Sequence, residues 1–439
     1  MKTYSSLKVE RTILVGFLSL ILIGTLLIWF ANYSGGKQIS LMDAMFTATS
    51  AVCVTGLAVL NTGRDLVPVS QGILLVLIQL GGLGVMTAAT TLLILMRQRI
   101  GIRQRLLFVG GMGIDSPAGA IRLLYRILKI TLIIEFAGAV ALFYGFYGDL
   151  PVGKSLYYAM FHSISAFCNA GFSPISTSLE SYASNVPVSG TVMVLIIIGG
   201  LGYLPLINFL AFLKRKERLN IHTRFVFSTS AVLIIFGTIL LLVSEWENGF
   251  VSLSWKWKVW NALFQSVTPR TAGFNTVPVS SFSSLGVLAL CILMIIGASP
   301  GSTGGGIKTT TSAVLFVSVW NFVRGRKNTV IWNRSIHAED TLRSLTITVM
   351  YICTIFFATF ILSMLEPFPF RSIIFEVISA LGTVGLSMGI TAELSTVGKF
   401  VLILLMFWGR VGLLTFIYGT LNKDSNSRIS YARANIPIG

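Results

Sequence analysis

The chain has few charged residues. Only 11% of its 439 residues are Asp, Glu, Lys or Arg, and 54% are hydrophobic, whereas about 25% of the residues in a soluble domain are charged. This composition excludes an ordinary soluble fold and predicts an integral membrane protein. The first apolar run, residues 13–29, has no A-x-A-like cleavage site behind it, so we expect it to be retained as a span.

Cysteine and histidine are also scarce. The chain has three histidines, none with a nearby set of ligands, and four cysteines without a C-x-x-C pair. We expect the cysteines to be small buried packing residues and not disulfide or metal ligands. No nucleophile–base pair, P-loop or dinucleotide fingerprint is present, so neither an enzyme nor a cofactor is expected in this chain.

One glycine turn recurs four times along this apolar sequence. Each turn ends a short apolar run that resembles a helix. The turns are V-T-G-L (54–57), N-A-G-F (169–172), T-A-G-F (271–274) and T-V-G-L (383–386). Glycine lets backbone carbonyls face an axis without an intruding Cβ, and a ring of carbonyls can replace the water around a cation. The pattern therefore predicts a pore lined mostly by main chain.

Each turn lies inside a unit of long span, short helix and long span. The units cover about residues 12–97, 121–214, 224–322 and 342–421, and their short helices are expected at 41–53, 155–168, 256–270 and 371–383. A spanning helix needs about 20 apolar residues, so these short helices are re-entrant. The predicted fold is all-α, with eight spans and four re-entrant pore loops arranged pseudo-fourfold around one central pore in a single domain, 1–439. The alternative, four ordinary turns between helices, does not explain their common placement.

Basic residues outnumber acidic residues, 33 to 16. Most of them fall in the N-terminal segment, in the connectors 97–105, 214–218 and 324–327, and in the tail 423–433. With the basic starts of the spans that follow these segments, 23 of the 33 basic residues lie on one side and eight on the other, while Lys308 and Arg410 fall inside spans. This asymmetry follows the positive-inside rule and predicts a multi-pass protein with both termini in the cytoplasm. The positive charge is thus a topology signal and does not indicate nucleic-acid binding.

The turns themselves contain no charged residue. A neutral carbonyl filter suits a weakly hydrated monovalent cation, whereas a divalent pore would carry a ring of carboxylates. Each short helix also points its partially negative C-terminus at the pore. The predicted filter residues are Val54, Thr55, Gly56, Asn169, Ala170, Gly171, Thr271, Ala272, Gly273, Thr383, Val384 and Gly385.

A glycine-rich break interrupts the second span of the third unit at residues 297–306. Proline removes a helix donor and glycine makes the backbone pliable, so a break just below the filter is predicted to gate the pore. The predicted gating residues in it are Gly297, Ser299, Pro300, Gly301, Gly304, Gly305 and Gly306. For the equivalent strings G-G-L-G (81–84, 199–202) and G-R-V-G (409–412), tight helix packing is the preferred interpretation.

Lys308 and Arg410 lie at membrane depth, where charges are costly and usually face a cavity or a partner. Arg410 is predicted to repel cations and to hold the loop shut by donating to its carbonyls; the alternative is an ion pair with the mid-span acid Glu135. Lys308 either belongs to the gate or extends to the cytoplasmic surface.

The turns, with F-C-N-A-G-F (167–172), T-P-R-T-A-G-F-N (268–275) and G-R-V-G-L-L-T (409–415), resemble the Trk/Ktr/HKT superfamily of potassium transporters over nearly the whole chain. Within it the chain is most similar to the KtrB-type membrane subunits of bacterial Ktr systems. A serine in the first turn, typical of sodium-selective plant members, is absent. The resemblance implies potassium uptake through a filter at the four glycines, an intramembrane gating loop at 297–306, a homodimer, and a cytosolic ring of nucleotide-binding RCK subunits of the KtrA type.

Several alternatives stay open at this point. The coupling ion, sodium dependence and the choice between channel-like transport and symport are not decided by these residues. A sodium or non-selective monovalent cation transporter is one alternative, and a secondary carrier with alternating access is another. Four units in the same orientation favour a filter, because carriers with a midplane site more often show inverted or paired repeats.

Overall fold

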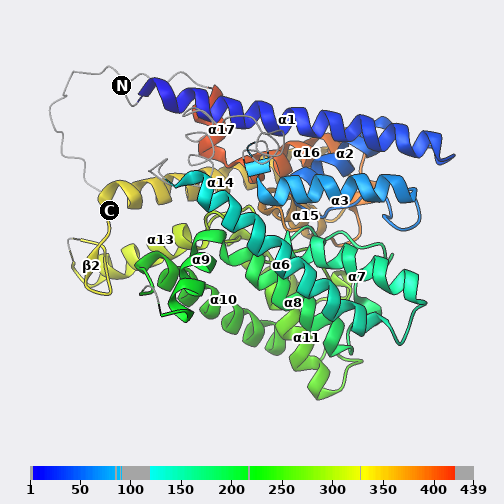
Figure 1. Cartoon of the computed structure of the whole chain (residues 1–439). Helices are drawn as coiled ribbons and strands as arrows, with labels where there is room; N and C mark the ends of the chain where they lie inside the picture. The colour runs from blue at the N-terminus through cyan, green and yellow to red at the C-terminus, as the bar shows by residue number, and fades with distance from the viewer. Residues whose placement is uncertain are drawn as a thin grey trace.

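Four long apolar helices dominate the computed structural model, which describes residues 3–84, 87–88, 90, 119–215, 218–326 and 328–420 (Figure 1). Among these residues, four helices are long and apolar enough to cross a membrane, or five if one bent pair counts as a span. Each long helix opens one predicted unit. The long helices are α1 (Thr3–Ser34), α6 (Ala120–Phe146), α10 (Ile221–Glu245) and α14 (Ala338–Leu365).

A short helix follows each long one, as the apolar run lengths predict. Their bounds agree with the predicted ones to within a few residues: α2 (Leu41–Val52), α7 (Val152–Phe167), α11 (Trp255–Val267) and α15 (Phe370–Gly382). Each carries one fully buried phenylalanine at a corresponding place, namely Phe46, Phe161, Phe264 and Phe375. The core is therefore built around the short helices, while the long helices expose side chains such as Leu22, Phe136 and Phe357 on their outer faces.

The second segment of each unit was expected to be a long span, but it is broken in the second and fourth units as well as at the predicted break in the third. Glycines at Gly84, Gly202 and Gly412 take φ values of +84°, +92° and +90°, which end the helices that precede them. The bend between α8 and α9 is 103°. The segments are α3 (Pro68–Leu83), α8 (Val186–Leu201) with α9 (Tyr203–Leu213), α12 (Ser284–Ile295) with α13 (Thr309–Val323), and α16 (Thr396–Val411) with α17 (Leu413–Thr420).

The remaining elements are small. Strands β1 (Val330–Ile331) and β2 (Arg334–Ser335) form an antiparallel hairpin between α13 and α14. Single 3₁₀ turns lie at Glu180–Tyr182, Val279–Ser281 and Thr391–Glu393, each between a glycine turn and the helix that follows it. The predicted basic connector 97–105 and the tail 423–433 lie outside the described residues.

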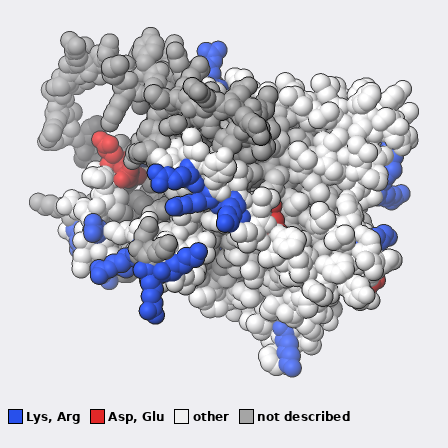
Figure 2. Space-filling model, in the orientation of Figure 1, with Lys and Arg blue, Asp and Glu red and all other residues white. Residues whose placement is uncertain are grey.

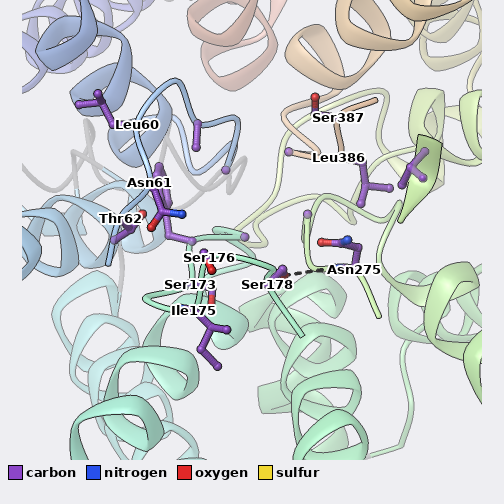
Figure 3. A pocket seen from close by; sticks show the side chains of 17 residues that line it. Leu60, Asn61, Thr62, Ser173, Ile175, Ser176, Ser178, Asn275, Leu386 and Ser387 are labelled. Carbon is purple, nitrogen blue, oxygen red and sulfur yellow. Dashed lines mark hydrogen bonds between the residues drawn. The ribbon is translucent and has the colours of Figure 1, made fainter. Parts of the chain in front are cut away.

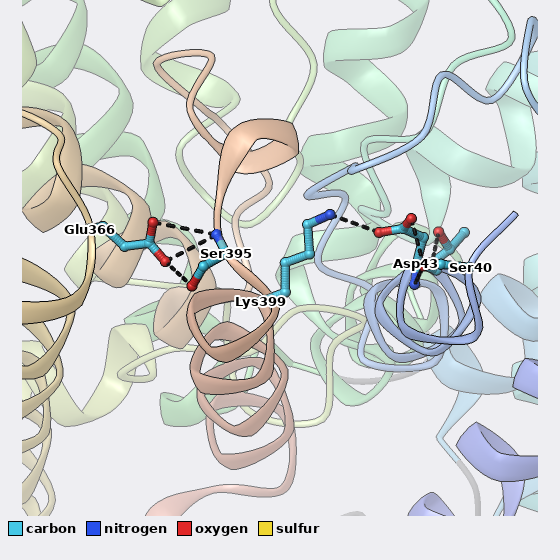
Figure 4. A network of polar contacts seen from close by, with 6 residues as sticks. Ser40, Asp43, Glu366, Ser395 and Lys399 are labelled. Atoms are coloured by element: carbon cyan, nitrogen blue, oxygen red, sulfur yellow. Dashed lines mark hydrogen bonds and ion pairs between the residues drawn. The ribbon is translucent and has the colours of Figure 1, made fainter.

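Contacts between the units run in a closed cycle. The second segment of each unit packs on the short helix of the next: α3 on α7, α8 on α11, α12 on α15, and α16 back on α2. A polar side-chain contact accompanies each pair: Gln71 with Tyr157, Ser189 with Trp260, Ser284 with Arg371, and Asp43 with Lys399. The last pair joins the fourth unit to the first at 2.8 Å (Figure 4).

Buried polar groups at the ends of three long helices hold the starts of the second segments. The carboxylate of Glu366 accepts hydrogen bonds from the backbone N–H and the hydroxyl of Ser395 (Figure 4). Glu245 does the same for Ser283, and the side chain of Asn32 accepts from the N–H of Val67. These acceptors satisfy donors that a helix N-terminus leaves free, so they fix the second segments against the long helices.

Three of the four cysteines are buried packing residues, as predicted: Cys53, Cys168 and Cys291. Cys353 is exposed, which corrects the prediction for that residue. It lies on α14 and is not among the buried residues of that helix.

Candidate functional site

The four predicted filter glycines meet in one ring. A Cβ atom added to any of them would come under 3.0 Å from a carbonyl oxygen of the next turn, so each position is closed to larger residues. The order is cyclic: Gly56 faces Ala170, Gly171 faces Ala272, Gly273 faces Val384, and Gly385 faces Thr55. The structure thus brings together four turns that are far apart in the sequence.

The backbone of every turn passes through the left-handed region twice. The glycines have φ values of +91°, +69°, +75° and +91°, and the residues two places before them, Val54, Asn169, Thr271 and Thr383, have φ values of 54°, 59°, 66° and 50°. For β-branched residues such as Val54 and Thr383 this conformation is strained. Strain of this kind persists where the surroundings impose it, and it gathers at functional sites.

Hydroxyl groups near the C-termini of the short helices hold the turns in place. Ser50 and Ser379 accept hydrogen bonds from the N–H groups of Gly56 and Gly385, at 3.0 and 3.1 Å. In the other two units the hydroxyl donates to the carbonyl that follows the glycine: Ser165 to Phe172 at 2.8 Å and Thr268 to Phe274 at 2.5 Å. Sequence reasoning missed these residues, although a Ser or Thr five or six places before each glycine was a visible signal.

A cavity of about 240 Å³ opens on one side of the ring, lined by all four glycines and by uncharged residues of the segments that follow them (Figure 3). Asn61, Ser176, Asn275 and Ser387 come to it from four different units. The side-chain amide of Asn275 is fixed by a hydrogen bond that it donates to the carboxylate of Glu180, at 2.6 Å. An uncharged polar mouth therefore leads to the ring.

Buried Glu376 of α15 fixes the segment beyond the fourth turn. Its carboxylate accepts hydrogen bonds from the hydroxyls of Ser387 and Thr391 and from the backbone N–H of Met388. These three bonds tie the rim of the cavity to the short helix. The role of Glu376 in the structure is thus to hold this rim.

The glycine-rich break at 297–306 lies directly against the ring on the side opposite the cavity. A Cβ on Gly304 or Gly305 would collide with the hydroxyl of Thr271 or Thr383, respectively. The N–H of Gly305 donates to Thr383 Oγ1 at 3.0 Å. Only glycine fits this close to the first residues of the third and fourth turns, which gives the run of glycines a physical reason.

Other contacts fasten the same loop to the second unit and to itself. The backbone N–H of Ser299 donates to the carbonyl of Gly200, and the backbone N–H of Tyr203 donates to the carbonyl of Gly301, both at 3.0 Å. The carbonyl of Pro300 packs against Gly202. Within the loop, Gly297 bonds to Ile307 at 2.9 Å, and a Cβ on Gly297 would meet Gly305 and Gly306. The loop therefore folds back on itself and contacts three units.

Arg410 and Lys308 both bind loop carbonyls. The guanidinium of Arg410 donates to the carbonyls of Thr303 and Gly81, and Lys308 Nζ donates to Gly304 at 2.7 Å. The alternative ion pair of these bases with Glu135 is wrong, because within the described part of the chain the acid contacts Cys168 Sγ at 3.9 Å and forms no ion pair. Lys308 turns back onto the loop and does not extend to the surface.

The tight-packing interpretation of the other glycine strings is confirmed. A Cβ on Gly81, Gly199 or Gly409 would collide with a carbonyl at the C-terminus of the neighbouring short helix, on Val52, Phe167 or Leu381. These glycines let the broken segments approach the filter turns. The three glycines that end the helices follow three residues later.

Comparison with known proteins identifies relatives for this arrangement. Residues 9–428 match a family model described as "TrkH: Cation transport protein". The chain is 38% identical over 434 residues to the "Ktr system potassium uptake protein B" of Vibrio alginolyticus, covering 98% of this chain and 94% of that protein. It is 36% identical over 428 residues to the "Potassium/sodium uptake protein NtpJ" of Enterococcus hirae, covering 96% and 94%. The resemblance to the Trk/Ktr/HKT superfamily is confirmed.

The fold has a solved counterpart. The crystal structure of the potassium transporter TrkH from Vibrio parahaemolyticus matches with a TM-score of 0.72 at 21% identity, covering 92% of this chain and 84% of that one. At this identity the likeness shows the fold, which is that of a membrane transporter. Together with the family match and the four long apolar helices, this fold indicates a multi-pass membrane protein.

Proposed function

The chain belongs to the TrkH family of cation transport proteins, and from this premise we propose that it carries potassium ions across the cell membrane through the glycine ring. The observation that carries the proposal is the cyclic approach of Gly56, Gly171, Gly273 and Gly385 to carbonyls of the neighbouring turns. Names of two relatives, both potassium uptake proteins, support the choice of ion.

Selection in this scheme comes from neutral oxygens. Carbonyls of the four turns replace the water around a weakly hydrated ion, and the C-termini of four short helices add a negative potential. The uncharged lining of the cavity beyond the ring fits this scheme, because a ring of carboxylates there would favour divalent ions. Hydroxyls such as Ser50 and Ser379 keep the oxygens at fixed positions.

The plug at 297–306 closes this path in the conformation described. An ion that leaves the ring meets Gly304 and Gly305, held against Thr271 and Thr383. The guanidinium of Arg410 adds a positive charge at the same place while it holds the loop. Transport then requires that the loop move away from the ring and that Arg410 release the carbonyl of Thr303.

The proposed architecture is one domain of four units, with eight spans and four re-entrant loops around a pseudo-fourfold axis. Each broken second segment counts as one span, and the closed cycle of contacts between units supports the axis. Lys and Arg side chains gather over the start of α6 and the α9–α10 connector, at one end of the molecule, beside a broad uncharged face (Figure 2). This asymmetry supports cytoplasmic termini, and the uncharged face contacts membrane lipid.

The proposed assembly is a homodimer with a cytosolic ring of nucleotide-binding RCK subunits of the KtrA type. Relatives named as proteins of a "Ktr system" support a system with more than one subunit. The basic end of the molecule offers a docking surface for it. The chain itself holds no cofactor in this scheme, potassium is its cargo, and the family is one of transport proteins, not enzymes.

A second candidate is combined potassium and sodium uptake, with or without sodium as a coupling ion. The name of the Enterococcus hirae relative, a "Potassium/sodium uptake protein", favours it. An alternating-access carrier is a weaker alternative, because the site is a ring of four turns and not a pair of broken helices at a repeat interface.

Rubidium uptake into proteoliposomes that hold only this chain tests the proposal. The expected result is uptake that potassium suppresses strongly and an equal concentration of sodium suppresses weakly. Equal competition by sodium would overturn potassium selectivity and favour the second candidate. Absence of rubidium uptake by correctly folded protein, with the plug removed as well, would refute the filter assignment.

A further inference from the structure

Two buried ionisable side chains of opposite sign, Glu135 and Arg270, lie next to the second and third turns. Each turn begins with a residue in the left-handed conformation. The residue before it, from the first turn to the fourth, is Cys53, Cys168, Arg270 and Gly382. In the second unit Cys168 contacts the carboxylate of Glu135 on long helix α6, with Sγ and Oε1 3.9 Å apart. In the third unit Arg270 itself reaches long helix α10, where Nη2 donates to Ser230 Oγ at 2.8 Å. The acid and the base thus occupy corresponding niches between a filter turn and a long helix.

Both charges are buried without a counter-ion. Relative exposure is 8% for Glu135 and 3% for Arg270, and within the described part of the chain neither forms an ion pair. Nε and Nη1 of Arg270 have no hydrogen-bond partner among the described residues. Ionisable groups at membrane depth are expensive and are usually retained for function. The count of basic residues in the sequence had placed Arg270 on the outer side, so its burial is a finding of the structure.

One side chain links the two niches. Asn169, the residue after Cys168, donates Nδ2 to the carbonyl of Arg270 at 3.2 Å and lies 3.5 Å from Thr271 Oγ1. The second and third turns are therefore bonded to one another at the level of the charges. In the first and fourth units the position before the turn holds Cys53 and Gly382, so neither position carries a carboxylate or a basic side chain, and Gly382 lies near the hydroxyl of Tyr351.

We propose that Glu135 and Arg270 are a pair of positioning residues that set the electrostatic potential of the filter in opposite directions. The carboxylate of Glu135 strengthens cation binding at the second turn, and the guanidinium of Arg270 weakens it at the third. Each partly offsets the other, so the ring binds potassium tightly enough to select it and weakly enough to release it. The inference rests on the proposed function and deepens it.

Other charges near the ring do not duplicate this pair. Arg410 and Lys308 bind loop carbonyls, and opening of the path breaks the contact between Arg410 and the loop. Glu376 is bonded to the rim of the cavity through three donors. Glu135 lies on α6 and Arg270 lies between α11 and the third turn, so neither belongs to the loop, and their field acts on the ring whether the loop is in place or not.

The test is the apparent KM for rubidium uptake in four variants at about pH 9, far above the ordinary pKa of a carboxyl. Glu135→Gln is expected to raise KM and Arg270→Gln to lower it, each on the order of tenfold from Coulomb's law at an effective dielectric constant of about 20. The double variant is expected to return close to the wild-type value. Arg270→Lys keeps the charge and is expected to leave KM nearly unchanged.

If both residues had a purely structural role, the two single substitutions would change KM in the same direction. The double variant would then not return to the wild-type KM. That result, or an unchanged KM in Glu135→Gln, would overturn the pair. If Arg270→Gln does not fold, Glu135→Asp serves as the control that keeps the charge. The inference then requires that Glu135→Gln raise KM and that Glu135→Asp leave it unchanged; any other result overturns it. Wild-type protein that takes up rubidium while the variants show no opposite shifts refutes this inference alone. Absence of uptake by the wild-type protein and by the variant that lacks residues 300–305 refutes the proposed function instead.

Discussion

The backbone N–H of Gly305 donates a hydrogen bond to the hydroxyl of Thr383 at 3.0 Å, so the glycine-rich loop is fastened to the filter itself. Thr383 begins the fourth turn in a left-handed conformation, with φ of 50°. Its hydroxyl can accept from the loop only while the loop stays in place. This contact links the loop directly to the fourth turn, so the proposed movement of the loop would change the surroundings of Thr383.

Gly273→Ser is expected to lower the preference for potassium over sodium by about tenfold or more. The new Cβ would meet the carbonyl oxygen of Val384 and Gly385 Cα, and the residue would keep a φ of +75° that is strained for serine. Competitive rubidium uptake measures the ratio. Gly36→Ser is the matched control, since Gly36 has a φ of +78° with nothing within 4 Å. An unchanged ratio in Gly273→Ser would remove this glycine from the filter.

Thr383→Val is expected to raise rubidium flux about fivefold, since loss of one buried hydrogen bond is worth about 1 kcal/mol. Valine fits the backbone there, because Val54 takes the same conformation in the first turn. Initial uptake rates measure the effect, and Thr383→Ser, which keeps the hydroxyl, is the control. Equal rates in both variants would show that the contact to Gly305 does not restrain the loop.

Arg410→Gln is expected to raise flux by about tenfold or more. The variant loses a positive charge near the path and charge-assisted bonds to Thr303 and Gly81, each worth about 1.5–3 kcal/mol. Arg410→Lys keeps the charge but cannot bind both carbonyls as a fork, so an intermediate flux is expected. If the lysine variant matches wild type, the barrier is the charge and not the hydrogen bonds.

Deletion of residues 300–305 is expected to raise flux further, because it removes Gly304 and Gly305 from their contacts with Thr271 and Thr383. Selectivity for potassium should persist, since the ring is left intact. Rubidium uptake with potassium or sodium as competitor measures both the flux and the selectivity. Lower or unaltered flux in a variant that elutes as folded protein would argue against a plug.

Asp43→Asn is expected to lower the free energy of unfolding by about 1 kcal/mol without changing the KM for rubidium. The ion pair with Lys399 is only partly shielded, with side-chain exposures of 20% and 15%, and such pairs contribute little. Thermal unfolding in detergent measures the loss. Lys399→Met should give a similar loss, with little added in the double variant. A raised KM in Asp43→Asn would instead assign the carboxylate to cation attraction.

Local features of the sequence were sufficient to predict the short helices and the four glycine turns. Run length separates a span of about 20 residues from a re-entrant helix, and glycine marks positions with positive φ wherever a tight turn needs it. The glycine-rich break was visible for the same reason. These signals depend on residues that are close together in the chain, so they can be recognised without knowledge of the fold.

Only the tertiary structure decided which groups meet across the ring. Arg410 binds Gly81, 329 residues away, and Thr303, 107 residues away, while within the described part of the chain Glu135 forms no ion pair with Arg410 or Lys308. Nothing local distinguishes a basic residue at a helix end in solvent from Arg270, which the packing of α10 buries. The sequence by itself determined a membrane protein with four helix–glycine units, because hydropathy and backbone freedom are local. Packing decided the partners of each charge, because long-range contacts depend on how the units close on one another.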